Sequence, residues 1–363
     1  MPDDEPTAAA RPGPTGRGRR GAAVTLSDVA REAGVSLATA SRAINGSATR
    51  TVRPDLQERV LEAAARLRYS PDANAQAMAR GRTSSVGLVV HDIADPYFAA
   101  IAAGVTRAAD RMGLTVTLTS TQHDPAREPA HVELLRRQRA RAVVVCGGRR
   151  DDEAANAAMR SALAEFRRAG GSVALVSQPL LGVSTVVIDN TGGAHALARA
   201  LHGRGYRRFG VLAGPADHLT ARDRVRGLLT ALTGLGCPPH PDAVVASAFT
   251  RDGGQDAMGR LLDRGPAVDV VVAVNDVMAL GALAAARERR VRVPRQVGVA
   301  GFDDIPTLRD VTPSLSTVHV PLVDIGEAAT QLALGPAGPE PRLLHVAGSV
   351  VLRDSTPGPG AVS

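Results

Sequence analysis

The residues of this chain that could carry out covalent chemistry are few and form no catalytic motif. Cys146 and Cys237 match no zinc-ligand spacing, and the histidines, such as His123 and His218, have no nucleophile near them in the sequence. The GxSxG, HExxH and GxxxxGKS/T patterns are missing, and no GxGxxG follows a strand. We therefore predict that the protein is not an enzyme, that it has no metal or cofactor, and that its histidines have surface or core roles.

Arginine supplies every basic side chain, and its distribution along the chain is uneven. The 363 residues carry 43 basic and 36 acidic side chains, a formal charge of +7. Residues 11–82 hold 13 arginines against six acidic residues, whereas residues 83–363 hold 30 against 27. This local excess points to an anionic partner for the first fifth of the chain. Its Pro/Gly/Arg-rich start, residues 1–22, is expected to be a disordered basic tail.

The sequence shows no sign of export or of membrane insertion. The N-terminus has no apolar stretch of the signal-peptide kind, and no run of 18 apolar residues occurs. We therefore predict a cytoplasmic, nucleoid-associated protein with no membrane contact.

Three short helical patterns follow the tail and fit a DNA-binding unit. Thr25 and Asp28 form a predicted capping box for a helix that stops at Gly34, and Ser36 is a predicted N-cap for a second helix over 37–45. A third pattern starts near Pro54. Two helices joined by a tight turn and completed by a third describe a helix-turn-helix unit. The alternative is a purely structural three-helix bundle, and the basic charge favours DNA binding. The third helix has a predicted apolar stripe of Leu56, Val60, Leu61, Ala64 and Leu67.

From residue 86 onward, apolar runs alternate with amphipathic helical patterns. Runs that are apolar throughout indicate strands covered on both faces, and their alternation with helices indicates parallel sheets. About 260 residues of this kind exceed one open sheet of usual size. We predict an α/β core of two lobes, with a ligand cleft at the carboxyl ends of the strands. The predicted strands are 86–90, 114–118, 142–146, 173–176, 209–212, 244–246, 268–274 and 297–300.

Motifs spread in order over nearly the whole chain resemble those of the LacI/GalR family of bacterial transcriptional regulators. The resemblance implies an all-α helix-turn-helix headpiece, a hinge helix, and a two-lobed core like that of periplasmic binding proteins, with three crossovers between the lobes. The matching motifs are Val24–Ser36, Thr39–Gly46, Tyr69–Pro71, Asp92–Phe98, Ile188–Asn190, Arg224–Gly227, Asn275–Leu283, Gly301–Asp304 and Val351–Thr356.

The same resemblance implies the domain boundaries. After the tail, a DNA-binding domain is expected at 23–70, a hinge helix and linker at 71–83, an effector-binding and dimerisation core at 84–356, and a disordered tail at 357–363. Within the core, the N-lobe is expected at 84–188 plus 320–336, and the C-lobe at 189–318 plus 341–356.

The second helix of a helix-turn-helix unit enters the major groove with its first residues against the base edges. The resemblance assigns base reading to Leu37, Ala38 and Arg42. Arg42 can bind a guanine through O6 and N7, whereas Leu37 and Ala38 offer only apolar contact. Phosphate contacts, which set register, are expected from Thr39, Ser41 and Asn45.

The hinge helix is also implied to touch DNA. A nine-residue helix is marginal in water, so it should order only when two copies pack together on DNA. Ala73 is an expected DNA contact, and Met78 stands where the family usually has a leucine that wedges into the minor groove.

The resemblance also implies that separate segments of the core form one effector site. Asp95 replaces the asparagine of an Asn-Pro-Phe-Phe loop, which turns a donor and acceptor into an acceptor only. Arg224 matches an arginine that binds ligand oxygens bidentately, and Phe249 an aromatic residue that stacks on a ring. Polar groups around an aromatic face are typical of a site for a small hydroxylated ligand, so we favour a sugar or sugar derivative. The expected effector-binding residues are Asp95, Tyr97, Phe98, Arg224, Phe249, Asn275 and Asp303.

These features together predict a sequence-specific transcriptional regulator, with repression expected, that binds palindromic double-stranded operator DNA as a homodimer. A small effector bound between the lobes would control its operator affinity. Two alternatives stay open: a purine- or nucleoside-responsive corepressor-type regulator, and a soluble sugar-binding receptor without DNA function.

Overall fold

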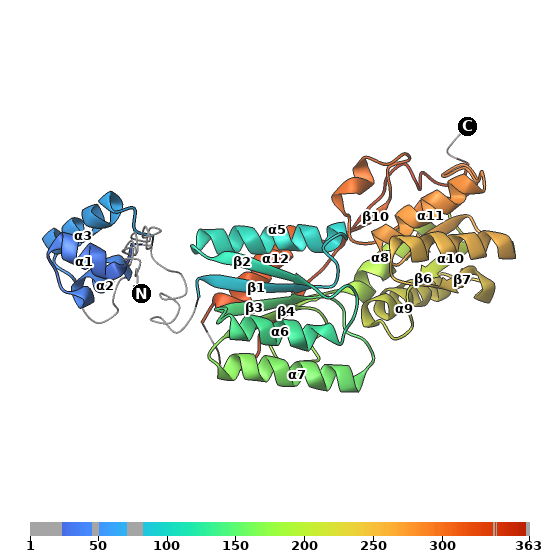
Figure 1. Cartoon of the computed structure of the whole chain (residues 1–363). Helices are drawn as coiled ribbons and strands as arrows, with labels where there is room; N and C mark the ends of the chain where they lie inside the picture. Colours follow the sequence, from blue (N-terminus) through green and yellow to red (C-terminus); the bar gives the residue numbers. More distant parts are fainter. Residues whose placement is uncertain (1–23, 46–50, 71–82, 337, 339, 361–363) are drawn as a thin grey trace, which may run out of the picture. The chain divides into compact units, whose positions relative to one another are not determined.

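The computed structural model describes residues 24–45, 51–70, 83–336, 338 and 340–360 (Figure 1). The chain divides into two compact units, residues 1–80, which we call the headpiece, and residues 81–363, which we call the core. Within the described ranges, no helix is long and apolar enough to cross a membrane.

The headpiece has three helices, α1 (Leu26–Ala33), α2 (Leu37–Asn45) and α3 (Pro54–Arg66). The predicted capping box is confirmed, because Thr25 accepts from the Asp28 N–H while the Asp28 carboxylate accepts from the Thr25 N–H. Gly34 ends α1 at φ 64°, a left-handed conformation that glycine adopts without strain and that makes the tight turn into α2. Ser36 caps α2 by accepting from the Thr39 N–H at 3.1 Å.

Apolar residues of all three helices form the small core of the headpiece. Val29, Ala40 and Val60 are fully buried in it. The predicted stripe of α3 is wrong at Leu61, which is 50% exposed. Val60 and Ala63, three positions apart on one helix face, point inward, and Leu61 lies about 100° further round the helix.

A six-stranded, wholly parallel sheet forms the N-lobe of the core. Helices α5 (Pro96–Arg111) and α12 (Leu322–Leu334) cover one face, and α6 (Arg127–Arg137) and α7 (Glu153–Arg168) cover the other (Figure 1). The strand order is β11-β5-β4-β3-β1-β2, with the strands β1 (Ser85–Val90), β2 (Thr115–Ser120), β3 (Ala142–Cys146), β4 (Ser172–Val176), β5 (Thr185–Ile188) and β11 (Leu343–Val346).

A four-stranded parallel sheet forms the C-lobe, which confirms the predicted fold class. Helix α8 (Asn190–Gly203) packs against α9 (Leu219–Gly234), and α10 (Arg251–Arg264) packs against α11 (Asp276–Glu288). The strand order is β7-β6-β8-β9, with β6 (Phe209–Ala213), β7 (Val244–Ala246), β8 (Val270–Ala273) and β9 (Gly298–Ala300).

The chain crosses between the lobes three times. The first crossover joins β5 to α8, the second follows β10 (Thr317–His319) into α12, and the third joins β11 to β12 (Ser349–Val351). Strands β10 and β12 pair antiparallel with each other, so two of the crossovers are tied together.

Two predicted boundaries are wrong. The segment 341–346 was expected in the C-lobe, but β11 pairs with β5 at the edge of the N-lobe sheet, with Leu343 opposite Thr185. The tail 357–363 was expected to be disordered from its first residue. Instead, the Gly358 N–H donates to the Tyr206 hydroxyl at 3.3 Å, and Arg204 donates to the Pro357 carbonyl at 3.4 Å, so residues 357–360 lie against the C-lobe.

Candidate functional site

The first residues of α2 present the surface expected to meet DNA. Leu37 is 51% exposed and Ala38 is exposed, so both apolar side chains are free to meet base edges. The Arg42 Nε donates to the Ala38 carbonyl at 3.0 Å, which holds the side chain along the helix. Within the described residues, its two terminal nitrogens have no carboxylate partner. This arrangement leaves a guanidinium edge available for a base or a phosphate.

The expected phosphate-contacting residues lie on the same helix. The Thr39 and Ser36 hydroxyls are 2.9 Å apart, and the Asn45 amide donates to the Ser41 hydroxyl at 3.3 Å. Ala73 and Met78 lie outside the described residues, so their DNA contacts stay predictions.

A cavity of about 200 Å³ lies where the two lobes of the core face each other. In each sheet the strand order reverses beside the first strand of the lobe, β1 or β6, and loops that leave such a switch point diverge and open a crevice. Residues that follow β1, β3, β6 and β8 line this cavity. All seven residues expected to bind the effector line the cavity: Asp95, Tyr97, Phe98, Arg224, Phe249, Asn275 and Asp303.

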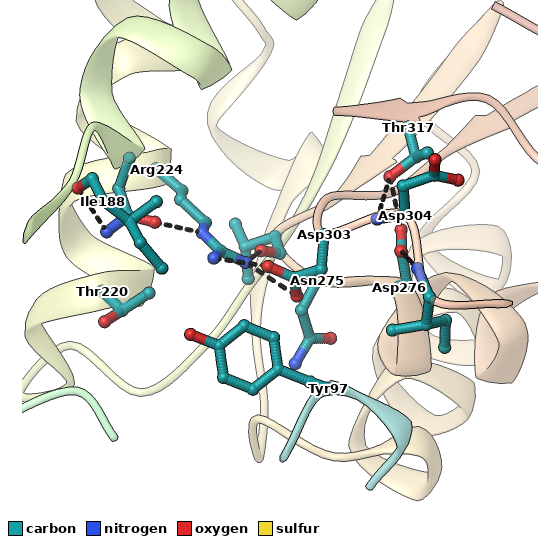
Figure 2. A network of polar contacts seen from close by, with 12 residues as sticks. Tyr97, Ile188, Thr220, Arg224, Asn275, Asp276, Asp303, Asp304 and Thr317 are labelled. Atoms are coloured by element: carbon teal, nitrogen blue, oxygen red, sulfur yellow. Dashed lines mark hydrogen bonds and ion pairs between the residues drawn. The ribbon is translucent and has the colours of Figure 1, made fainter. Parts of the chain in front are cut away.

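Arg224 and Asp303 form a buried ion pair at the floor of the cavity (Figure 2). The two terminal nitrogens of Arg224 donate to the Asp303 carboxylate at 3.2 and 2.7 Å. Its Nε donates to Asn190 and its Nη1 also to the Val274 carbonyl, each at 2.8 Å. The guanidinium lies over the Phe302 ring at 3.8 Å. Four of the five guanidinium N–H groups are therefore used within the protein, and one on Nη2 remains for a ligand.

The backbone at Asp303 is strained. Asp303 has φ 123° and Asp304 has φ 58°, which are conformations that favour glycine. Several hydrogen bonds hold this corner: the Asp304 N–H donates to the Thr317 hydroxyl at 3.3 Å, and His319 and Arg353 bind the Asp304 carboxylate at 3.0 and 2.6 Å. The strained corner thus joins the cavity floor to the crossover strand β10.

Asp276 continues this network behind the cavity (Figure 2). The Thr317 hydroxyl donates to its carboxyl at 2.7 Å and the Ile305 N–H at 3.0 Å. Burial, with a smaller effect from the charge of Asp303, raises the pKa of Asp276 to about 8. At neutral pH the carboxyl of Asp276 is therefore mostly protonated, and Asp303 is the charged partner of Arg224.

Two polar residues of the cavity also cap helices. Asp95 caps α5 by accepting from the Tyr97 N–H at 2.9 Å, and Asn275 caps α11 by accepting from the Met278 N–H at 2.9 Å. Each uses one side-chain oxygen as a cap, so the second carboxylate oxygen of Asp95 and the amide NH₂ of Asn275 are left for a ligand. In Figure 2, Tyr97 lies between Thr220 and Asn275.

The aromatic wall of the cavity is arranged differently from the expectation. Tyr97 and Phe98 meet edge to face with ring centroids 5.0 Å apart. Phe249 was expected to offer a ring face to the ligand, but His218 stacks on it at 4.6 Å and an interplanar angle of 24°. One face of Phe249 is therefore covered by the protein, and only the other face and the edge can meet a ligand.

A buried cluster on the N-lobe wall was missed by the sequence analysis. The Glu128 carboxylate accepts from His91 at 3.0 Å and from Arg149 at 2.6 Å, and Arg149 also donates to Asn156 at 3.1 Å. Burial alone would raise the pKa of Glu128, but the hydrogen bond from His91 and the charge of Arg149 bring it below the usual value. His91 and Arg149 follow the predicted strands β1 and β3, so their positions at strand ends were a usable signal.

The expectation of surface or core roles was wrong for three histidines, because His91, His123 and His218 line the cavity. Burial lowers the pKa of His218 to about 3 and, to a smaller extent, also lowers that of His123. Both rings are therefore neutral at pH 7. The Nδ1 of His218 already accepts from the Ala221 N–H at 3.4 Å, so its Nε2–H is the donor that remains for a hydroxylated ligand.

A set of contacts crosses from one lobe to the other beside the cavity, and we call it the clasp. Arg150 of the N-lobe pairs with Asp217 of the C-lobe at 2.7 Å, and Asp151 pairs with Arg222 at 2.7 Å. Between these ion pairs, the Asp151 N–H donates to the Asp217 carbonyl at 2.8 Å and the Leu219 N–H to the Arg149 carbonyl at 2.9 Å. The Gln178 amide also donates to the Thr220 hydroxyl at 3.0 Å. These contacts connect the two lobes directly.

A helix-turn-helix unit and a two-lobed core with a central cavity define the class of ligand-responsive DNA-binding proteins. The family model described as bacterial regulatory proteins, lacI family, matches residues 25–72, and the model described as periplasmic binding proteins and sugar binding domain of LacI family matches residues 83–334. The chain belongs to the LacI family of bacterial regulatory proteins and is a DNA-binding transcriptional regulator.

Individual relatives match over almost the whole chain. The transcriptional regulator GalS of Salmonella typhimurium LT2 is 35% identical over 320 residues, which are 87% of this chain and 91% of GalS. The structure of a complex of the regulator CelR with cellobiose has a TM-score of 0.67 at 32% identity and covers 92% of this chain and 99% of that one. A lac repressor dimer bound to operator and an anti-inducer has a TM-score of 0.77 at 26% identity, with the same two coverages.

Proposed function

We propose that this protein is a transcriptional repressor that binds a palindromic operator as a homodimer, and that a sugar or sugar derivative in the cavity of the core controls its operator affinity. The observation that carries the proposal is the convergence of all seven predicted effector residues on one cavity at the switch points of both lobes. The lac repressor dimer on its operator and the CelR complex with cellobiose support the partners. The protein would act by binding and not by catalysis, at the nucleoid in the cytoplasm.

A hydroxylated ligand suits the polar groups of the cavity. The second oxygen of Asp95, the Asn275 amide, the Tyr97 hydroxyl and the neutral His218 ring can exchange hydrogen bonds with several hydroxyls. Phe98 and the open side of Phe249 can pack against the C–H face of a sugar ring. A purine is the second candidate, and it would have a single face of Phe249 to stack on, because His218 covers the other face.

Ligand and operator are coupled by a shared free energy. A ligand that favours one arrangement of the lobes changes operator affinity, and the operator changes ligand affinity by the same factor. Couplings of this kind are typically about 1–3 kcal/mol.

The experiment is a thermal-shift screen of the full-length protein against sugars, polyols and nucleosides, followed by electrophoretic mobility shifts on a palindrome upstream of the gene. A sugar that raises Tm and changes operator affinity supports the proposal. A nucleoside hit with no sugar hit would favour the purine alternative. A sugar hit with no binding to any promoter fragment at low ionic strength would favour a receptor without DNA function.

The hinge helix gives a second test of the DNA half of the proposal. Met78→Gly removes the expected apolar wedge, so we expect weaker operator binding with unchanged ligand affinity. Filter binding measures the first quantity and calorimetry the second. Unchanged operator affinity would refute the wedge role of Met78.

A further inference from the structure

Every arginine at the cavity is already neutralised by a carboxylate of the protein. Arg149 pairs with Glu128 at 2.6 Å and Arg224 with Asp303 at 2.7 Å, with all four side chains almost fully buried. Arg150 pairs with Asp217 at 2.7 Å on the half-exposed rim. The lining, as far as the structure describes it, thus has no arginine without a carboxylate partner.

The histidines of the cavity do not replace the missing cation. His218 and His123 are neutral near pH 7 because burial lowers their pKa values. His91 is engaged by Glu128 at 3.0 Å. An anionic group on a ligand would therefore have to compete with a carboxylate of the protein for an arginine. Taking Arg149 or Arg224 would leave Glu128 or Asp303 buried and unpaired.

Asp95 differs from Glu128 and Asp303, the other carboxylates of the cavity lining, in its pairing. It lines the cavity and is half-buried, and no arginine or histidine of the described residues lies within salt-bridge distance of it. One oxygen caps α5, and the other has no hydrogen-bond partner among these residues. Burial raises the pKa of Asp95 to about 6, so the side chain still carries its negative charge at pH 7 and above.

We propose that Asp95 selects the effector by charge: it accepts a hydrogen bond from a hydroxyl or ammonium group of a neutral or amino-substituted sugar, and it excludes sugars that carry a phosphate or carboxylate. This inference rests on the proposed function and narrows its ligand class. A carboxylate oxygen bound to a sugar hydroxyl makes a charge-assisted hydrogen bond, which is stronger than a neutral one. The same oxygen repels an anion placed next to it, and like-charge contacts in a binding site are strongly unfavourable.

The test is a calorimetric titration of the full-length protein with matched sugars that differ only in charge. The probes are glucose, glucosamine, glucuronate and glucose 6-phosphate, together with galactose, galactosamine, galacturonate and galactose 6-phosphate. We expect the neutral or amino member of at least one series to bind, and its phosphate and carboxylate counterparts to bind about tenfold more weakly or worse. Equal or tighter binding of an anionic member would overturn the charge selection and leave the regulator intact. If no member of either series binds, the inference falls, and the screen with polyols, oligosaccharides and nucleosides then decides whether the sugar-binding function falls with it.

Asp95→Asn isolates the charge, because an asparagine oxygen can still cap α5. We expect this variant to bind anionic members within about twofold of their neutral counterparts, while circular dichroism and Tm report an intact fold. Asp92→Asn is the matched control on the same loop. Asp92 accepts from the Ala94 N–H at 2.9 Å and does not line the cavity, so its replacement should leave the discrimination unchanged. An Asp95→Asn protein that discriminates like the native protein would assign Asp95 a capping role only.

Discussion

Arg42 shows at the scale of one residue how a local hydrogen bond can prepare a side chain for DNA. Its Nε donates to the Ala38 carbonyl, and its two terminal nitrogens have no carboxylate partner among the described residues. Base reading by arginine needs those two nitrogens together on the O6 and N7 of one guanine. Arg42 fits that use, whereas an arginine with a purely structural role would form an ion pair with a carboxylate.

Arg42→Ala should weaken operator binding by about 1–3 kcal/mol and relax the preference at one base pair of each half-site. Mobility shifts on the operator and on single-substitution variants, all at one salt concentration, measure both effects. Arg66→Ala is the control, because Arg66 is an exposed headpiece arginine that pairs with Glu32 at 3.5 Å and Glu62 at 3.7 Å. An equal loss of affinity on every sequence would instead make Arg42 a phosphate contact.

The buried ion pair of Arg224 and Asp303 leads to a second prediction about a single residue. Asp303→Asn leaves the Arg224 charge buried without its counter-charge, and breaking such a pair typically costs about 3–5 kcal/mol. We expect this loss in the free energy of unfolding of the core by urea denaturation, together with weaker ligand binding. Asp263→Asn, which breaks the exposed pair with Arg289, should change stability little. Native stability in Asp303→Asn would mean that Arg224 finds another partner.

At the scale of elements, α5 and α12 approach each other through glycine. A Cβ on Gly104 would lie 1.9 Å from the Val323 carbonyl oxygen, and one on Gly326 would lie 2.1 Å from the Ile101 carbonyl oxygen. These contacts are with backbone atoms, which cannot rotate away. The two helices that cover one face of the N-lobe sheet can therefore pack this closely only without side chains at these positions.

Gly104→Ala should lower the free energy of unfolding by about 1–3 kcal/mol, because the clash with α12 outweighs the better helix propensity of alanine. Urea denaturation of the full-length protein measures the change. Gly203→Ala is the control, since a Cβ on Gly203 at the end of α8 would meet no atom within 4 Å. If both variants had the free energy of unfolding of the native protein, α5 and α12 would have to move apart without any loss of stability.

At the scale of the core, the clasp sets how readily the lobes separate. Two ion pairs and two backbone hydrogen bonds connect the segment after β3 with the segment after β6. Both ion pairs are partly exposed, so each adds only modest stability and is screened by salt. Separation of the lobes would break these contacts, so their strength contributes to the free-energy difference between open and closed lobes.

Arg150→Asp should shift the ligand-free core toward open lobes by about two- to fivefold, and adding Asp217→Arg should restore closure by re-forming the ion pair with reversed charges. Distances between spin labels on α6 and α10 measure this change. Asp223→Arg is the control, because the ion pair of Asp223 is with Arg226 of the same helix, α9. Identical distances in all four proteins would show that the backbone hydrogen bonds alone hold the lobes.

Local signals explain which parts of the fold could be predicted. The ends of α1 and α2 depend on Thr25, Gly34 and Ser36, all within a few residues of the helices they limit. Strands β3 and β7 match the predicted ranges to the residue because each is a short apolar run that needs burial wherever it lies. Strand β11 lacks that signal: Leu343 is 50% exposed, and its partner β5 lies about 158 residues earlier in the chain.

The sequence by itself determined the kinds of elements, the α/β class of the core and which residues follow the strand ends, since hydrophobic period and capping are local properties. Only the tertiary structure decided which polar groups remain unpaired at the cavity. It placed His218 on Phe249, Asp303 on Arg224 and Glu128 between His91 and Arg149, and it left Asp95 without a counter-charge. The reason is physical: charge pairing depends on distance in space, and these partners come from loops and helices that are far apart in the sequence and that only the fold brings together.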